Sequence, residues 1–402
     1  MMFTDHKSLL SPNKTKIVLL VMDGLGGMAL QAGGLTELET AKTPNMDQLA
    51  REGTLGQTMP IHYGITPGSG PAHMSLFGYN PVTHEVGRGV LEAIGVGMYV
   101  NKGDVAARGN FCTVDDQGLI SDRRAGRIPS EEATPIVDKL KIIQLPGVEV
   151  EINHVKEHRF AVVMRGADLS PDLEETDPQK TGVAPYDVKA KNSGAKKTAE
   201  LYNQWIAEAR KILKNEPKAN ALTLRGFATD PGLESYMDRY ELKAACVAVY
   251  PMYKGVAQLV GMDVIDFPDE TPADEFKAVA EVWNGYDFFF IHIKKTDSYG
   301  EDGNFDAKVH VIEIVDEAIP LLTALKPDVL IITGDHSTPA MLKSHSWHPV
   351  PFLLWAPGTV RADEQTKFGE KYCVHGGLGT FNALETIPLA LAHALRLNKF
   401  GA

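Results

Sequence analysis

The sequence predicts an α/β fold, and three apolar segments lead to that prediction. They are "KIVLLVMDG" (16–24), "DFFFIHIKKTD" (287–297) and "DVLIITGDH" (328–336). Continuous apolar runs of this kind are typical of parallel strands that are buried on both faces. Because segments with helical periodicity lie between them, we expect a mostly parallel sheet flanked by helices.

Three helices are expected around this sheet. The first has Thr43 as its N-cap, Pro44 at its first position and Gly53 just after its end. The second covers residues 305–325, and Pro320 should kink or divide it because proline cannot donate the helical hydrogen bond. The third covers residues 382–397.

The middle of the chain follows a different pattern. Short strand-like segments such as "FAVVMRG" and "NALTLRG" alternate there with helical segments such as "AKKTAELYNQWIAEARKILKN". We interpret residues 103–238 as a smaller α+β domain inserted into a core that consists of residues 1–102 and 239–402. The apolar segment "AACVAVY" after the insert is expected to rejoin the main sheet.

Composition and charge limit the classes of function. The 402 residues include 44% hydrophobic and 23% charged residues, which is the balance of a globular protein. A net charge of −12 argues against nucleic acid or an anionic membrane as a partner. No apolar run is long enough to cross a bilayer, and the N-terminus lacks the apolar core of a signal peptide. Three scattered cysteines fit a reduced, cytoplasmic setting. The sequence does not predict an oligomeric state.

Acidic residues follow all three predicted strands. Asp23, Asp297 and Asp335 come at or just beyond the strand ends, and His336 and His345 follow the last strand. Ligands of open α/β sheets bind outside the carboxyl ends of the strands, so we expect one shared site there. Carboxylates and imidazoles bind divalent metal ions. The alternative for each residue alone is a turn-capping aspartate or a surface histidine.

Two further features have a functional and an ordinary interpretation. Ser69 stands between Gly68 and Gly70 ahead of a predicted short helix, where it is a candidate nucleophile or a simple N-cap. Glu301 lies four positions after Asp297, so the two carboxylates can meet on one helical turn. The alternative for this pair is an acidic, solvated loop.

These motifs together resemble the alkaline-phosphatase superfamily. More closely, the chain resembles the archaeal-type branch of the cofactor-independent phosphoglycerate mutases, which also occurs in bacteria. The resemblance spans nearly the whole chain in order, through "VMDG", "TPGSGPAHMSLFGYNP", "GRGVLEAIGVG", "GDVAARGNF", "TDPQKTG", "LRGFA", "YPMYKGVAQLVGM", "HIKKTDSYGEDGNFDAK" and "GDHSTPAMLKSHSWHPVP". It implies an alkaline-phosphatase-like fold.

The resemblance implies two divalent metal ions and no 2,3-bisphosphoglycerate. Asp23, Ser69, Asp335 and His336 would hold one ion, and Asp297, Glu301 and His345 would hold the other. More distant members usually have histidine at the position of Glu301. The additional carboxylate favours Mn²⁺ or Mg²⁺ over Zn²⁺, with Mn²⁺ as the first choice and Co²⁺ as a further alternative.

The resemblance also implies residues that contact a small anionic substrate, a phosphoglycerate. Lys254 would contact the phosphate beside the metals, and Arg108, Arg225 and Arg127 would hold the substrate from the inserted domain, which would act as a lid. Asp177 would be the general acid or base for the glycerate hydroxyls. The ordinary interpretations are surface or ion-paired arginines and an aspartate that caps a turn.

The reaction implied is the interconversion of 3- and 2-phosphoglycerate through a phosphoserine at Ser69, a step of glycolysis and gluconeogenesis. A phosphomonoesterase, or a phosphotransferase of the homoserine-kinase type, would share the same metal core, because a fold does not fix a function. A metal-binding scaffold without catalysis is the third interpretation.

Overall fold

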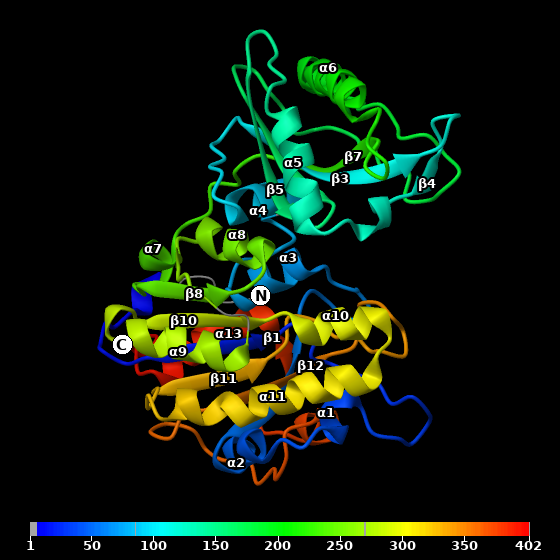
Figure 1. Ribbon diagram of the computed structural model, residues 1–402. Coiled ribbons are helices and arrows are strands. Elements are labelled where there is room, and N and C mark those ends of the chain that lie inside the picture. The colour runs from blue at the N-terminus through cyan, green and yellow to red at the C-terminus, as the bar shows by residue number, and fades with distance from the viewer. Residues whose placement is uncertain (1–5, 85, 269–270, 402) are drawn as a thin grey trace. The chain divides into compact units, whose positions relative to one another are not determined.

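The computed structural model describes residues 6–84, 86–268 and 271–401, and the chain divides into two compact units (Figure 1). Unit 1 comprises Met1–His84, Glu234–Tyr250 and Val260–Ala402, and unit 2 comprises Glu85–Leu233 and Pro251–Leu259. No helix among the described residues is both long and apolar enough to cross a membrane.

An eight-stranded sheet forms the centre of unit 1. Its strand order is β13-β2-β12-β11-β1-β10-β8-β9, and every neighbouring pair is parallel except the two pairs made by β12. The strands are β1 (Ile17–Met22), β2 (Thr54–Met59), β8 (Ala244–Ala248), β9 (Asp263–Val264), β10 (Phe288–Ile293), β11 (Val329–Thr333), β12 (Val350–Trp355) and β13 (Gly379–Asn382). The predicted α/β class is thereby confirmed.

Helices cover both faces of this sheet. Side chains of α2, α9 and α11 pack with alternate strand residues such as Leu20 and Ile291 in one buried cluster. On the other face, Phe77 beyond α3 packs edge-on against Phe290, with ring centroids 4.8 Å apart. The helices are η1 (Lys7–Leu9), α1 (Glu37–Thr40), α2 (Pro44–Glu52), α3 (Ser69–Leu76), α7 (Tyr236–Tyr240), α9 (Pro272–Val282), η4 (Trp283–Gly285), α10 (Lys295–Asp302), α11 (Phe305–Thr323), α12 (Glu370–Cys373), η5 (Ala383–Glu385) and α13 (Thr386–His393).

Unit 2 is built on a five-stranded antiparallel sheet. The order is β4-β3-β6-β5, and β7 also pairs with β3. Helices α5 and α6 pack on one face, and α4 packs on the other. The elements are α4 (Arg88–Gly95), β3 (Val105–Val114), β4 (Ile120–Asp122), η2 (Ala125–Arg127), α5 (Ser130–Leu140), β5 (Glu149–Lys156), β6 (Arg159–Arg165), η3 (Ser193–Ala195), α6 (Lys196–Leu213), β7 (Ala221–Ala228) and α8 (Pro251–Leu259).

The borders of unit 2 differ from the expected insert, residues 103–238, because α4 packs on its sheet and α8 packs on α4. Glycines make this packing possible. A Cβ at Gly89 would lie 2.5 Å from the carbonyl oxygen of Ala106 on β3, and one at Gly255 would lie 2.0 Å from that of Leu91 on α4. The two helices therefore approach their neighbours at backbone distance.

Two expected helices differ from those observed. Helix α11 continues through Pro320 to Thr323, so the predicted division does not occur. Ile319 and Leu322 on either side are buried in the core, and this packing compensates for the missing hydrogen bond. The final helix spans only Thr386–His393, because Leu395 adopts a left-handed conformation with φ 55° soon after its end.

We expect Gly255→Ala to destabilise unit 2 by about 1–3 kcal/mol, because the added methyl group collides with a backbone atom that cannot move away. The midpoint of urea unfolding, followed by the fluorescence of Trp205 in unit 2, measures the loss. Gly194→Ala is the matched control, since its Cβ would come no closer than 3.4 Å to a neighbouring atom. Equal midpoints for the two variants would show that the close approach of α8 to α4 at Gly255 does not contribute to stability.

Candidate active site

The register of the central strands brings three aspartates to one edge of the sheet. Strand β1 pairs in parallel with both β10 and β11, and all three end at the same level. Asp23 follows β1 directly, Asp335 follows β11 after one glycine, and Asp297 lies in the first turn of α10 behind β10. None of the three is more than 2% exposed. The expected shared edge is therefore present.

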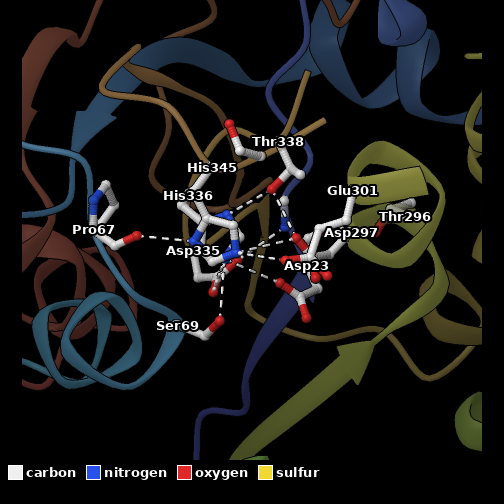
Figure 2. A network of polar contacts seen from close by, with 12 residues as sticks. Asp23, Pro67, Ser69, Thr296, Asp297, Glu301, Asp335, His336, Thr338 and His345 are labelled. Atoms are coloured by element: carbon white, nitrogen blue, oxygen red, sulfur yellow. Dashed lines mark hydrogen bonds and ion pairs between the residues drawn. The ribbon is translucent and has the colours of Figure 1, made fainter. Parts of the chain in front are cut away.

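Five of the predicted metal-binding residues form two overlapping groups. In one, ligand atoms of Asp23, Asp335 and His336 lie within 4.8 Å of one another; in the other, those of Asp297, His336 and His345 do. Figure 2 shows these side chains turned toward one another from the loop after β1, from α10 and from the segment after β11. His336 belongs to both groups, whereas the sequence interpretation assigned it to one.

The electrostatics of these groups favour a cation. Burial, together with the charge of Asp23, raises the pKa of the Asp335 carboxyl well above its usual value. Burial also lowers the pKa of His336 far below its usual value, so the ring stays neutral. Lys294 offsets part of the negative charge, because its ammonium group lies 2.8 Å from Asp23 Oδ2 and 2.5 Å from Asp297 Oδ2.

The residues present fit a divalent metal ion. Asp335 Oδ2 is buried, has no hydrogen-bond partner within the described part of the chain, and lies 3.2 Å from His336 Nε2. His336 Nε2 also lies 3.4 Å from Asp23 Oδ1. Carboxylate oxygens and an imidazole nitrogen at this spacing are the ligands of Mn²⁺, Zn²⁺ and related ions.

Ser69 contributes its hydroxyl group to the same place. It is the first residue of α3, and Gly68, not Ser69, is the N-cap. The Ser69 hydroxyl therefore does not cap the helix and instead lies 3.2 Å from His336 Nε2. Its exposed fraction is 5%, so the candidate nucleophile is close to the acidic groups and largely shielded from water.

His345 and Glu301 extend the second group toward the surface. His345 stacks on His336 with ring centroids 3.6 Å apart, and its Nδ1 lies 2.9 Å from the carbonyl oxygen of Pro67. This bond directs His345 Nε2 toward Asp297 Oδ1 at 3.5 Å and Glu301 Oε1 at 3.9 Å. The Glu301 side chain is 56% exposed, so it lies at the border of the group.

A basic cluster lies on the sheet of unit 2. Arg108 on β3 pairs directly with Arg225 on β7. Burial first, and then the charge of Arg88, lowers the pKa of Arg108 to about 10; Arg159 and Arg225 act in the same direction. The buried Nε of Arg108 has no hydrogen-bond partner among the described residues. Arg225 Nε donates a 2.9 Å hydrogen bond to Glu175, whereas an anion could satisfy the free donor of Arg108.

Asp177 lies beside this cluster. Arg123 donates hydrogen bonds of 3.2 and 2.8 Å to its two oxygens, and Arg225 Nη1 lies 3.7 Å away. Burial works against ionisation, but the hydrogen bonds from Arg123 and from the backbone of Gln179 hold the pKa of Asp177 below its usual value. Asp177 is therefore a carboxylate at neutral pH, and the hydrogen bonds from Arg123 stabilise that form.

The other two predicted substrate residues are also in unit 2. Arg127 is exposed and ends η2, in which Ala125, Gly126 and Arg127 all have positive φ. Lys254 is half-buried on α8. The expected contact of Lys254 with a phosphate group beside the metals stays a prediction.

Sequence reasoning missed several residues of the site. Lys294 binds two of the aspartates, and Thr338 joins Asp297 to His336. His73 lies 3.3 Å from Asp335 Oδ2, and burial lowers its pKa to about 4. The signal for Lys294 was its place three residues before Asp297 in "IKKTD". Thr338 and His73 carry no comparable signal, because many threonines and histidines near strand ends only face solvent.

Comparison with known proteins places the chain among relatives of similar length. A family described as "2,3-bisphosphoglycerate-independent phosphoglycerate mutase" matches residues 50–219. Proteins named as probable members from Aquifex aeolicus and Thermus thermophilus are each 50% identical, over 98% and 100% of both chains, respectively.

Two solved structures resemble the whole chain. A protein of Pyrococcus horikoshii is 32% identical with a TM-score of 0.83, and the match covers 97% of this chain and 100% of that one. A cofactor-independent phosphoglycerate mutase from Thermoplasma acidophilum is 30% identical with a TM-score of 0.70, over 94% and 100%. The fold is thus that of known proteins.

The buried position of His158, close to several arginines, predicts a pH dependence of stability. Burial first, and then the charge of Arg159 and three further arginines, lowers the pKa of His158 from 6.5 to about 3. The unfolded chain binds a proton at His158 below pH 6.5 and the folded chain does not. The free energy of unfolding should therefore fall as the pH drops from about 6.5 toward 3, by up to about 1.4 kcal/mol per pH unit.

Urea unfolding of the native chain and of His158→Gln between pH 7.5 and 4.5 tests this expectation. The variant cannot take up the proton, so the stability difference between the two proteins should shrink as the pH falls. Groups that titrate in both proteins cancel in this difference. A difference that is constant across the range would mean that His158 titrates normally in the folded chain.

Proposed function

Because the chain belongs to the family of 2,3-bisphosphoglycerate-independent phosphoglycerate mutases, which are isomerases, we propose that it interconverts 3- and 2-phosphoglycerate through a phosphoserine at Ser69. The reaction uses bound divalent metal ions and belongs to glycolysis and gluconeogenesis. The proposal rests on the position of the Ser69 hydroxyl. This hydroxyl does not cap α3 and lies 3.2 Å from His336 Nε2, among the buried acidic groups.

The metal ions are assigned to the two overlapping groups. Asp23, Asp335 and His336, with Ser69, would hold one ion, and Asp297 and His345, with Glu301 at the border, would hold the other. The oxygen-rich donor set favours Mn²⁺. Bound ions would make the Ser69 hydroxyl a stronger nucleophile and offset the charge of the phosphoryl group.

Ser69 attacks the phosphorus atom in the first half of the reaction. Its Oγ forms a bond to phosphorus and loses its proton, while the bond from phosphorus to the glycerate oxygen breaks and that oxygen takes up a proton. The position of Ser69 at the start of α3 supports this role, because free backbone N–H groups and the helix dipole there attract a phosphoryl group.

The second half of the reaction returns the phosphoryl group to the other hydroxyl of the glycerate. Asp177 takes the proton from that hydroxyl, the oxygen attacks the phosphoserine, and Ser69 Oγ is released and protonated. The lowered pKa of Asp177 keeps it in the carboxylate form, which is the form that can take up a proton. When the reaction runs in reverse, the same carboxyl group returns that proton to the leaving glycerate oxygen.

The basic cluster of unit 2 would hold the anionic groups of the substrate. Arg108 and Arg225 face each other across β3 and β7, and the buried Nε of Arg108 lacks a hydrogen-bond partner within the described residues. A carboxylate or phosphate oxygen would satisfy this donor and add a negative charge beside the two guanidinium groups. Lys254 and the exposed Arg127 are assigned to further contacts with the phosphoryl and carboxylate groups.

Incubation with 3-phosphoglycerate and Mn²⁺, followed by ³¹P NMR, tests the proposal. We expect 2-phosphoglycerate to appear until equilibrium is reached, without added 2,3-bisphosphoglycerate. Inorganic phosphate as the only product would instead identify a phosphomonoesterase. Transfer of the phosphoryl group only to an added amino-acid hydroxyl, such as that of homoserine, would identify another phosphotransferase.

Ser69→Ala should lower kcat by at least about a thousandfold, since no other hydroxyl replaces the nucleophile. The variant should still bind Mn²⁺, because its carboxylate and imidazole ligands remain. Ser75→Ala is the control on the same helix; Ser75 Oγ is buried and has no hydrogen-bond partner among the described residues, so this variant should stay active. Turnover by Ser69→Ala at the native rate would remove Ser69 from the mechanism.

Glu301→Gln should weaken the binding of one Mn²⁺ ion and leave the other unchanged, because Glu301 adjoins only the group that contains His345. Calorimetric titration of the metal-free protein resolves the two binding events. Asp302→Asn, the next carboxylate on α10 and exposed, removes the same charge and serves as the control. Equal weakening of both ions, or of neither, would exclude Glu301 as a selective ligand.

A further inference from the structure

The hydroxyl group of Thr338 joins the two groups of acidic and histidine side chains. Thr338 Oγ1 lies 2.8 Å from Asp297 Oδ1 and 2.9 Å from His336 Nδ1. The residue is fully buried, so no water competes for these bonds. Figure 2 shows the threonine next to the cluster, with dashed lines to both partners.

The direction of these two hydrogen bonds is fixed by chemistry. A threonine hydroxyl has one proton to donate and can accept as well. The Asp297 carboxylate, whose other oxygen binds the Lys294 ammonium group, can only accept. The hydroxyl proton therefore points to Asp297, and His336 must carry a proton on Nδ1 to complete the second bond.

A proton on Nδ1 leaves Nε2 of a neutral His336 with its lone pair. That atom lies 3.2 Å from Ser69 Oγ, 3.4 Å from Asp23 Oδ1 and 3.2 Å from Asp335 Oδ2. A histidine binds a metal ion as neutral imidazole, and the bond made by its other nitrogen selects the tautomer. Thr338 thus selects the tautomer that can bind a metal ion at the nucleophile.

The surroundings hold Thr338 in place from several sides. Its backbone N–H lies 3.2 Å from the carbonyl oxygen of Gly24 and 3.0 Å from that of Gly26. Lys308, fully buried on α11, donates to the carbonyl oxygens of Thr338, Gly24 and Gly26 at 2.9, 2.8 and 3.1 Å. Gly24 has φ 63°, and a Cβ there would lie 2.4 Å from Thr338 Oγ1. The loops around the hydroxyl leave it little freedom to rotate away.

We propose that Thr338 is a positioning residue that fixes the tautomer of His336 and the orientation of Asp297, and so couples the two metal-binding groups. The inference rests on the proposed metal site and adds a residue that touches neither substrate nor metal. Removal of the hydroxyl should impair both ions together, because one hydrogen-bond chain serves both groups.

Thr338→Val removes the hydroxyl and keeps the shape of the side chain, and Thr338→Ser keeps the hydroxyl. We expect Thr338→Val to weaken Mn²⁺ binding by about 10- to 100-fold, the range known for residues that support metal ligands. Thr338→Ser should recover most of that affinity. Thr386→Val is the matched control, because Thr386 is fully buried and its hydroxyl has no hydrogen-bond partner in the described part of the chain.

The tautomer of His336 is measured separately, by ¹⁵N NMR of the metal-free protein with labelled histidine. His336 should carry its proton on Nδ1 in the native chain and in Thr338→Ser, and lose this preference in Thr338→Val. If the native chain binds no Mn²⁺, the metal assignment fails while the tautomer result still tests the role of Thr338. Native Mn²⁺ affinity in Thr338→Val, or a loss in Thr338→Ser as large as in Thr338→Val, would overturn the proposal.

Discussion

The rest of the structure depends on how the negative charge of three buried carboxyl groups, at one edge of a parallel sheet, is compensated. Asp23, Asp297 and Asp335 are almost fully buried, and two unit charges 4 Å apart repel by about 4 kcal/mol at an effective dielectric constant of 20. Such a group is stable only if protons or cations compensate it. The raised pKa of Asp335 and the Lys294 ammonium group are the compensation present in the chain itself. A divalent cation can replace both, so the fold and the proposed chemistry depend on the same charge balance.

Two buried side chains, those of Glu37 and Lys308, hold the backbone of the loops that follow β1 and β11. Glu37 is fully buried and accepts hydrogen bonds from the N–H groups of Met28 and Ala340, which belong to the loops after β1 and β11. Lys308 binds carbonyl oxygens of the same two loops, 4.0 Å from a carboxylate oxygen of Glu37. A buried lysine and a buried glutamate thus satisfy the donors and acceptors of the loops that separately follow two neighbouring strands. This framework can hold the ligand residues within the tolerance that metal binding requires.

The sequence predicted the features that depend on local pattern. The central strands appear as continuous apolar runs, so the α/β class and the place of Asp23, Asp297 and Asp335 followed from strand direction alone. The family resemblance supplied Arg108, Arg225 and Asp177, which periodicity could not indicate. Features that depend on tertiary contacts could not be predicted from the sequence. Helix α11 continues through Pro320 because of its packing. Helices α4 and α8 belong to unit 2 because Gly89 and Gly255 allow a close approach of backbones. Thr338 and Lys308 act through contacts between distant loops, for which one sequence holds no signal.

The two groups of ligand residues differ in their surroundings, and this difference has a chemical consequence. Asp23, Asp335 and His336 are completely buried, so an ion there would exchange its water ligands for protein atoms. In the second group the His345 side chain is 20% exposed and Glu301 is 56% exposed, which leaves room for an oxygen atom from solvent or a substrate. His336 belongs to both groups, and its Nε2 also lies 3.2 Å from Ser69 Oγ, so the ring links the proposed nucleophile with both groups. The buried group of Asp23, Asp335 and His336 would thus be suited to hold the proposed nucleophile. The more exposed group with His345 would be suited to receive the phosphoryl oxygens of the substrate.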